Sequence, residues 1–227
     1  MKKIGLIGGI TPASTILYYQ ILNALNANRL GKPHSAEIVI NSFDFGQISK
    51  LQTAERWDLL DALMAKAGKD LENAGASCIL ICANTMHLCI DAVRNAVRIP
   101  VLHIAEATSK IIIEKKLKKV ALLGTKYTME KDFFIDILSS FGIETIIPAL
   151  EDRNTIHAVI YDELSLGEIL PASKEKYLKI IARLIKDGAE GIVLGCTEIP
   201  LLIQQKDVAV PVFDTTEIHA TAAFKVS

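Results

Sequence analysis

Two short segments of this chain place small polar side chains directly after apolar runs. Residues 83–85, Ala-Asn-Thr, follow the run at 78–82, and residues 196–198, Cys-Thr-Glu, follow the run at 191–194. Where a strand ends and a helix begins, backbone N–H groups favour a bound carboxylate. The same groups favour the thiolate form of a cysteine over the thiol, whose pKa is ordinarily about 8.5. The two segments therefore predict a carboxylate-binding site beside a reactive Cys196 thiol.

These segments occupy equivalent places in an internal repeat. KKIGLIGG at 2–9 returns as KKVALLGT at 118–125, and GASCILICANT at 75–85 returns as GAEGIVLGCTE at 188–198. A third pair, PVLHIAEAT from residue 100 and PVFDTTEIH from residue 211, follows in the same order. Such self-similarity indicates two related structural units. The repeat aligns Cys196 with Ala83, so one unit offers a thiol where the other offers a methyl group.

Strand-like runs alternate with segments of helical periodicity in both halves. The expected strands are 4–7, 36–40, 78–82, 100–103, 120–123, 145–147, 191–194 and 210–213, and the expected helices are 13–28, 56–74, 86–97, 106–116, 129–141, 155–164, 174–186, 199–205 and a final helix opened by Asp214 and Glu217. This alternation predicts parallel sheets whose functional groups lie at the strand ends. We expect an α/β fold of two similar doubly wound parallel-sheet lobes related by internal pseudo-symmetry, with the site in the cleft between them. The first lobe is residues 1–103 plus 208–227, and the second is 104–207.

Composition narrows the class of protein. Hydrophobic residues make up 50% and aromatic residues only 6% of the chain, which is typical of the aliphatic core of parallel sheets. Lys plus Arg number 25 and Asp plus Glu 26, so no basic field favours nucleic acid or a membrane surface. No run suits a signal peptide or a membrane span. The cysteine spacing suits neither disulfides nor a metal, so we expect a cytoplasmic protein with reduced thiols.

Five sequence motifs, distributed over nearly the whole chain, resemble those of a known protein family. They are the start GGxxxxSTxxYYxxxN from Gly8 to Asn23, the stretch LGKPHSA from Leu30, the run NTMH from Asn84, the run ALLGTxYTM from Ala121 and the run GCTEI from Gly195. With these motifs the chain resembles the aspartate/glutamate racemase family, in its broad-specificity amino-acid racemase branch. The resemblance implies two α/β lobes, a homodimer, and racemisation that needs neither metal nor pyridoxal phosphate.

The resemblance also implies roles for particular residues. A thiolate removes the α-proton from one face of the amino acid, and a thiol on the other face returns a proton to the planar carbanion. Cys196 matches one of these groups, and the position of Ala83 matches the other. The expected substrate-binding residues are Gly9, Ile10, Gln52, Asn84, Thr85, Thr125, Thr197 and Glu198. The expected partners are a small amino acid and a second copy of the chain, with no nucleic acid and no membrane. His87 either assists a thiol or has a capping and packing role.

Ala83 departs from the family pattern, which puts cysteine before Asn-Thr. Cys82 lies one residue early, and since neighbouring side chains of a strand point to opposite faces, Cys82 should face the core. The Cys82 side chain can contact a substrate only if the end of the strand is irregular. Three explanations stay open: Ala83 is an introduced substitution, it is natural in a single-thiol enzyme such as the similar arylmalonate decarboxylases, or the chain binds an amino acid without turning it over.

Recognition of the substrate side chain is a second departure. Similar aspartate enzymes use an arginine after the second strand and a lysine in the second lobe. Here those segments are FGQIS at 45–49 and ELSLG at 163–167, which contain no cation, although Lys50 is adjacent. Aspartate and glutamate are expected from the resemblance alone, and a neutral amino acid is the alternative.

Overall fold

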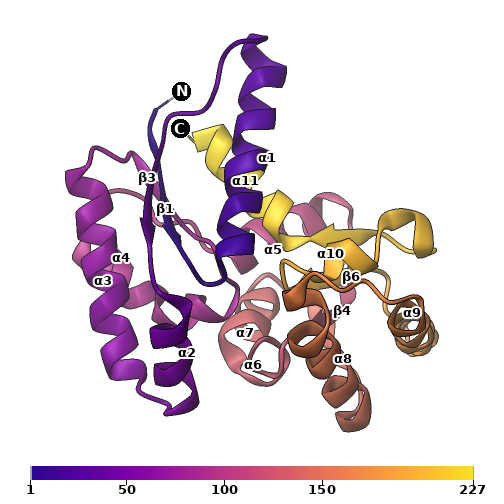
Figure 1. The fold of residues 1–227 in the computed structure, drawn as a ribbon. Coiled ribbons are helices and arrows are strands. Elements are labelled where there is room, and N and C mark those ends of the chain that lie inside the picture. The colour runs from indigo at the N-terminus through magenta and orange to yellow at the C-terminus, as the bar shows by residue number, and fades with distance from the viewer. Residues whose placement is uncertain (1, 227) are drawn as a thin grey trace. The chain divides into compact units, whose positions relative to one another are not determined.

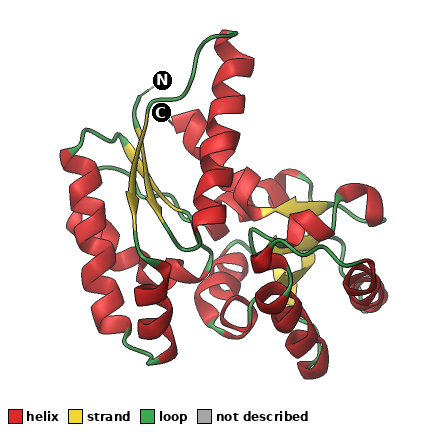
Figure 2. Cartoon of the chain, in the orientation of Figure 1, coloured by secondary structure: helices red, strands yellow, loops and turns green. Residues whose placement is uncertain are grey.

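The computed structural model describes residues 2–226, which form seven strands and a larger number of helices (Figures 1 and 2). The strands are β1 (Ile4–Gly8), β2 (Ile38–Ser42), β3 (Cys78–Ile81), β4 (Lys119–Gly124), β5 (Glu144–Ile146), β6 (Ile192–Gly195) and β7 (Val212–Asp214). The α-helices are α1 (Pro12–Leu30), α2 (Phe45–Thr53), α3 (Trp57–Asn73), α4 (Ile90–Ala96), α5 (Ile104–Glu114), α6 (Lys126–Glu130), α7 (Asp132–Ser140), α8 (Leu150–Asp162), α9 (Pro171–Lys186), α10 (Ile199–Leu202) and α11 (Thr215–Val226). Three 3₁₀ turns are η1 (Thr85–Cys89), η2 (Leu164–Leu166) and η3 (Gln205–Asp207).

The chain divides into two compact units. Unit 1 comprises the described residues up to Ile104 together with those from Thr216 onward, and unit 2 is Ala105–Thr215. All strand pairs in both units are parallel, in the order β2-β1-β3 in unit 1 and β5-β4-β6-β7 in unit 2. The fold is therefore the repeated parallel α/β architecture that the sequence predicts.

In unit 1, helices cover both faces of the sheet (Figure 1). Alternate residues of β3 and its extension divide between two buried clusters. Ile79, Ile81 and Ala83 belong to the cluster that includes α3 and α4. Cys82 belongs instead to the cluster formed with α1 and α11, and it is fully buried. The strand alternation thus places Cys82 in the core, as expected, and its pKa is raised by burial.

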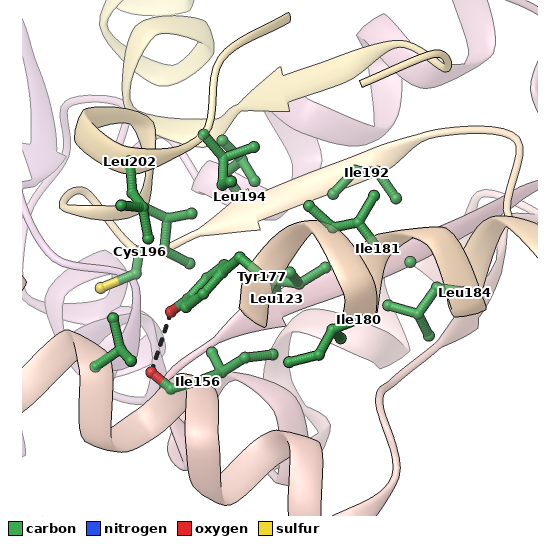
Figure 3. Close-up of a cluster of buried hydrophobic side chains, with 14 of the residues drawn as sticks. Leu123, Ile156, Tyr177, Ile180, Ile181, Leu184, Ile192, Leu194, Cys196 and Leu202 are labelled. Carbon is green, nitrogen blue, oxygen red and sulfur yellow. Dashed lines mark hydrogen bonds between the residues drawn. The ribbon is translucent and has the colours of Figure 1, made fainter. Parts of the chain in front are cut away.

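In unit 2, the sheet preserves the register of the repeat. Leu123 pairs with Leu194 in β4 and β6, as Ile7 pairs with Ile81 in β1 and β3. Leu194 and Cys196 lie in one apolar cluster with side chains of α8 and α9 (Figure 3). Cys196 therefore stands two residues beyond the paired strand residue, at the place that Ala83 occupies in unit 1.

The structure corrects the expected helix at 86–97. The backbone N–H of His87 would donate to the Ala83 carbonyl in an α-helix, but that carbonyl is bonded to Nδ1 of the His87 ring at 2.9 Å. The His87 N–H donates to the Asn84 carbonyl at 3.0 Å instead, which is 3₁₀ geometry. The regular helix α4 consequently begins only at Ile90.

Other boundaries also differ from the expectation. The helix expected at 129–141 is split into α6 and α7 by Lys131, whose backbone is extended with φ −94° and ψ 145°. The strand expected at 100–103 reduces to one bridge between Val101 and Ile79. The final strand, β7, pairs with β6 and lies in unit 2, so that only α11 returns to unit 1. No helix was expected after the second strand, but the structure has α2 there, which Asp44 caps by accepting from the Gly46 N–H.

Candidate active site

Paired strands bring the proposed thiol and a threonine together in unit 2. Gly124 pairs with Gly195 at the ends of β4 and β6, so Thr125 and Cys196 are the next residues of neighbouring strands. Thr125 caps α6, and its Oγ1 accepts from the Thr128 N–H at 3.4 Å. Cys196 retains 9% exposure, so its side chain is recessed but not sealed inside the unit.

The Cys196 thiol is bonded to a carboxylate. Its Sγ donates to Oε2 of Glu198 at 2.9 Å, and Oγ1 of Thr197 donates to the same oxygen at 2.7 Å. Burial raises the pKa of the thiol well above its ordinary value, and the negative Glu198 raises it further. The expected lowering of this pKa is wrong for the structure described, because burial and a like charge outweigh the backbone N–H groups.

Two tyrosines lie close enough to this pair to be affected by its charge, and no sequence motif indicated them. Burial, then Tyr127, Cys196 and Glu198, raise the pKa of Tyr161 to about 12, so its phenol stays protonated. The Tyr177 hydroxyl donates to the Ile156 carbonyl at 3.1 Å (Figure 3). Tyr127 lies within the ALLGTxYTM motif, but no periodicity distinguishes Tyr161 from an ordinary residue of α8.

The matching strand ends of unit 1 are also occupied by expected site residues. Gly9 has a φ of +81° and donates its N–H to Thr15 Oγ1 at 2.8 Å. Ile10 and Ala83 share one buried cluster with Met86. The buried Gln52 side chain donates from Nε2 to the Met86 sulfur at 3.2 Å, so Gln52 is adjacent to this cluster.

Side chains hold three successive carbonyls at the end of β3. Ser14 Oγ donates to the Cys82 carbonyl at 2.5 Å. The His87 ring bonds through Nδ1 to the carbonyls of Ala83 and Asn84, at 2.9 and 3.2 Å. The loop that contains Ala83, Asn84 and Thr85 is therefore fixed from the core side of unit 1.

The segments expected to recognise a substrate side chain contain no cation. One forms the start of α2, and the other follows α8 and contains η2. In the second segment the Glu163 carboxylate has one buried oxygen without a hydrogen-bond partner, and its charge raises the pKa of the nearby Tyr177, after burial and Cys196. Segment 163–167 therefore carries one acidic side chain and no cation.

Residues 2–226 contain neither a candidate metal site nor a helix suited to crossing a membrane. No three or more His, Cys, Asp and Glu residues between 2 and 226 gather in a way that could hold a metal ion. Among the helices in the same range, none combines the length and the apolar character that crossing a bilayer requires.

The repeated parallel units match the two-lobed fold of a glutamate racemase from Bacillus anthracis, with a TM-score of 0.67 at 17% identity over 99% of this chain and 81% of the other. A sequence model described as Asp/Glu/Hydantoin racemase matches residues 7–223. The chain therefore belongs to the Asp/Glu/Hydantoin racemase family.

Individual relatives agree with this membership. A candidate Asp/Glu racemase from Yersinia pestis is 44% identical with a TM-score of 0.95, and the match covers 100% of this chain and 99% of the other. An aspartate racemase homologue from Pyrococcus horikoshii is 38% identical with a TM-score of 0.89 over the same shares of the two chains. A glutamate racemase from Shewanella woodyi is 24% identical over 65% of this chain and 54% of its own length, so the match spans about half of that relative. Together they indicate an amino-acid racemase.

Proposed function

We propose that this protein moves the α-proton of an amino acid such as aspartate or glutamate, with Cys196 as the proton-transfer group and no cofactor. The observation that carries the proposal is the hydrogen bond from Cys196 Sγ to Glu198 Oε2, 2.9 Å long, at the end of a central strand. A thiol can act as a base only after losing its proton. The hydrogen bond supports the Glu198 carboxylate as the group that accepts this proton.

The proposed proton transfer has two steps. The S–H proton of Cys196 passes to Glu198, and the thiolate then takes the proton from Cα of the substrate. The electron pair of the broken C–H bond is delocalised into the substrate carboxylate. In this proposal the hydroxyls of Thr125 and Thr197 and the N–H groups at the strand ends donate to that carboxylate, and their hydrogen bonds strengthen as its charge increases. The raised thiol pKa supports this order, because Cys196 rests as a thiol and yields a strongly basic thiolate.

Position 83 determines the stereochemical result. A methyl group carries no proton, so Ala83 neither abstracts nor returns one. The Cys82 thiol is buried in the cluster with α1 and α11, which does not support it as a substitute. We therefore expect Cys196 to return a solvent-derived proton to the face from which it took the first. Exchange with retention should be faster than inversion.

For the side chain of the substrate, the proposal covers acidic and neutral amino acids. Family membership supports aspartate and glutamate. The absence of a cation at 45–49 and 163–167, together with the charge of Glu163, supports a neutral side chain of similar size.

The resemblance further supports a homodimer, and the composition supports a cytoplasmic location. Light scattering on the purified protein tests the homodimer.

Proton NMR in heavy water tests the proposal. Each enantiomer of aspartate, glutamate and a neutral amino acid such as homoserine is incubated with the protein, and loss of the α-proton signal is followed alongside optical rotation. We expect loss of signal in at least one substrate with little change of rotation. No exchange in any of them contradicts proton transfer.

Cysteine variants separate this proposal from its alternatives. Cys196→Ala should abolish exchange, whereas Cys78→Ala, which removes another buried thiol, should leave it unchanged. A protein that only binds amino acids shows no exchange and the same affinity before and after Cys196→Ala. Carbon dioxide release from a substituted malonate, lost in Cys196→Ala, would identify a single-cysteine decarboxylase.

A further inference from the structure

Three histidines are buried together in unit 1, and none of them has a place in the proposed proton transfer. His87, His103 and His219 are 1%, 4% and 0% exposed. The ring centroid of His87 lies 4.8 Å from that of His103 and 5.4 Å from that of His219. Buried rings at such distances need fixed hydrogen bonds, because an unpartnered or charged imidazole in the core is costly.

The contacts of His87 fix its tautomer. Its Nδ1 faces two carbonyl oxygens, those of Ala83 and Asn84, so Nδ1 must carry the hydrogen. Its Nε2 lies 3.2 Å from the backbone N–H of Ile104, so Nε2 must present a lone pair. The ring is therefore neutral with its hydrogen on Nδ1. With both nitrogens engaged in the backbone, His87 is unsuited to exchange protons with a substrate or to assist a thiol.

The carbonyls that His87 holds determine where neighbouring N–H groups point. In a trans peptide the C=O and N–H bonds point in opposite directions. The Ala83 carbonyl shares its peptide group with the Asn84 N–H, and the Asn84 carbonyl shares its peptide group with the Thr85 N–H. Because His87 turns both carbonyls toward the core, it turns both N–H groups the other way.

We propose that His87 is a positioning residue: by holding the carbonyls of Ala83 and Asn84 it aims the N–H groups of Asn84 and Thr85 at the substrate carboxylate. The inference rests on the proposed function for its substrate, but its structural part can be tested without turnover. The bond from the Ile104 N–H to Nε2 fixes the ring itself by tying it to the first residue of α5.

Two substitutions of His87 each remove a different part of its hydrogen-bond network. In His87→Asn the amide nitrogen falls near the place of Nδ1, so it donates to Ala83, while the acceptor for Ile104 is lost. In His87→Gln the amide oxygen falls near the place of Nε2, so it accepts from Ile104, while the donor to Ala83 and Asn84 is lost. Each variant loses one part of the network, so both should be destabilised to a similar extent.

The two variants should differ at the loop and in substrate binding. Hydrogen exchange followed by mass spectrometry should show faster exchange of the amides at 83–85 in His87→Gln than in His87→Asn. The KM should rise about tenfold in His87→Gln and change less than about threefold in His87→Asn, the difference expected for misplaced donors to a charged group. His219→Gln is the control, because it removes the acceptor of the Tyr18 hydroxyl, bonded at 2.8 Å, without touching 83–85.

Nitrogen-15 NMR of the imidazole rings measures the protonation state and tautomer of His87 without depending on activity. We expect a neutral His87 with its hydrogen on Nδ1. An Nε2-protonated or cationic ring, or equal amide protection at 83–85 in both His87 variants, overturns the inference whether or not the protein turns over an amino acid. If the ring and the amides behave as expected but the wild-type protein exchanges no α-proton, the positioning of the loop stands and the proposed function fails.

Discussion

The Sγ of Cys196 lies 2.9 Å from Oε2 of Glu198, and that same oxygen accepts from Thr197 at 2.7 Å. Three consecutive side chains thus form one hydrogen-bonded group at the end of β6. The threonine hydroxyl holds the carboxylate in place, and the carboxylate holds the thiol proton. In the proposed transfer, Glu198 accepts the thiol proton through this contact, and Cys196 reaches the thiolate form by that step.

Glu198→Gln should slow α-proton exchange about a hundredfold or more, because the amide keeps the shape of the side chain but cannot take the thiol proton. The measurement is the initial rate of α-proton loss in heavy water. Glu175→Gln, which removes an exposed carboxylate paired with Lys179 at 4.0 Å, is the matched control and should leave the rate unchanged. A Glu198→Gln rate within twofold of wild type argues against Glu198 as the base.

The reactivity of Cys196 should also report its raised pKa. Alkylation by iodoacetamide requires the thiolate, so the midpoint of its rate against pH should lie above pH 9 for Cys196. Glu198→Gln should move this midpoint down, since the carboxylate charge raises the pKa and the amide does not, while burial still keeps it above the value for a free cysteine. Peptide mapping resolves Cys196 from the three other thiols. A wild-type midpoint at or below that of a free cysteine contradicts this account.

Much of the architecture could be predicted from the sequence because it depends on repetition and on strand alternation. The repeat aligned Ala83 with Cys196, and the parallel registers of Ile7 with Ile81 and Leu123 with Leu194 match that alignment. Alternation placed Cys82 in the core. These features are local patterns that the packed sheet preserves.

What could not be predicted depends on contacts between distant residues. Nothing in the pattern around His87 indicates that its ring would take the Ala83 carbonyl and replace the first α-helical turn by a 3₁₀ turn. The pKa of Cys196 was expected to fall because a helix start was visible in the sequence, whereas burial and the orientation of Glu198 were not. Tyr161 approaches the thiol from α8, more than thirty residues away in the chain.

Gly9→Ala should lower the unfolding free energy far more than an ordinary glycine substitution does. Gly9 has a φ of +81°, and a Cβ there would collide with the backbone of Phe43. Gly142 has a similar φ of +75° but nothing within 4 Å of the added carbon, so Gly142→Ala measures the conformational cost alone. We expect a loss of about 1 kcal/mol in unfolding free energy for Gly142→Ala and about 3 kcal/mol for Gly9→Ala, measured by urea denaturation. Equal losses would mean that the approach of Phe43 carries no cost.

The buried histidines should make the protein sensitive to acid. In the folded chain burial lowers the pKa of all three, that of His103 to about 3, whereas an unfolded histidine titrates near pH 6.5. Below about pH 6.5 the unfolded chain therefore binds protons that the folded chain does not, and stability falls as pH falls. His103 and Arg94 lower the pKa of His87 further, and His87 lowers that of His219, so these neighbouring groups add to the effect of burial.

The slope of unfolding free energy against pH measures this effect. Each histidine that stays neutral should contribute about 1.4 kcal/mol per pH unit between pH 6 and 5. Glutamine cannot titrate, so His103→Gln should reduce the slope of unfolding free energy against pH by the contribution of one histidine. This holds even if the substitution lowers stability at every pH. An unchanged slope in His103→Gln would show that this histidine is protonated in the folded protein.

Ala83→Cys should convert an exchanging protein into an inverting one. Ala83 stands where the repeat places Cys196, it follows Ile79 and Ile81 on one face of the strand, and it is 9% exposed, as is Cys196. A thiol at this position can supply the second proton-transfer group that the methyl lacks, so the ratio of inversion to α-proton exchange should rise at least about tenfold, as loss or gain of a general acid does. Polarimetry and proton NMR on the same samples give the two rates, with Ala83→Ser as a control that adds a polar atom of weaker acidity. If the ratio does not rise in a folded Ala83→Cys protein, position 83 does not face the reacting carbon, and the one-thiol explanation for retention is wrong.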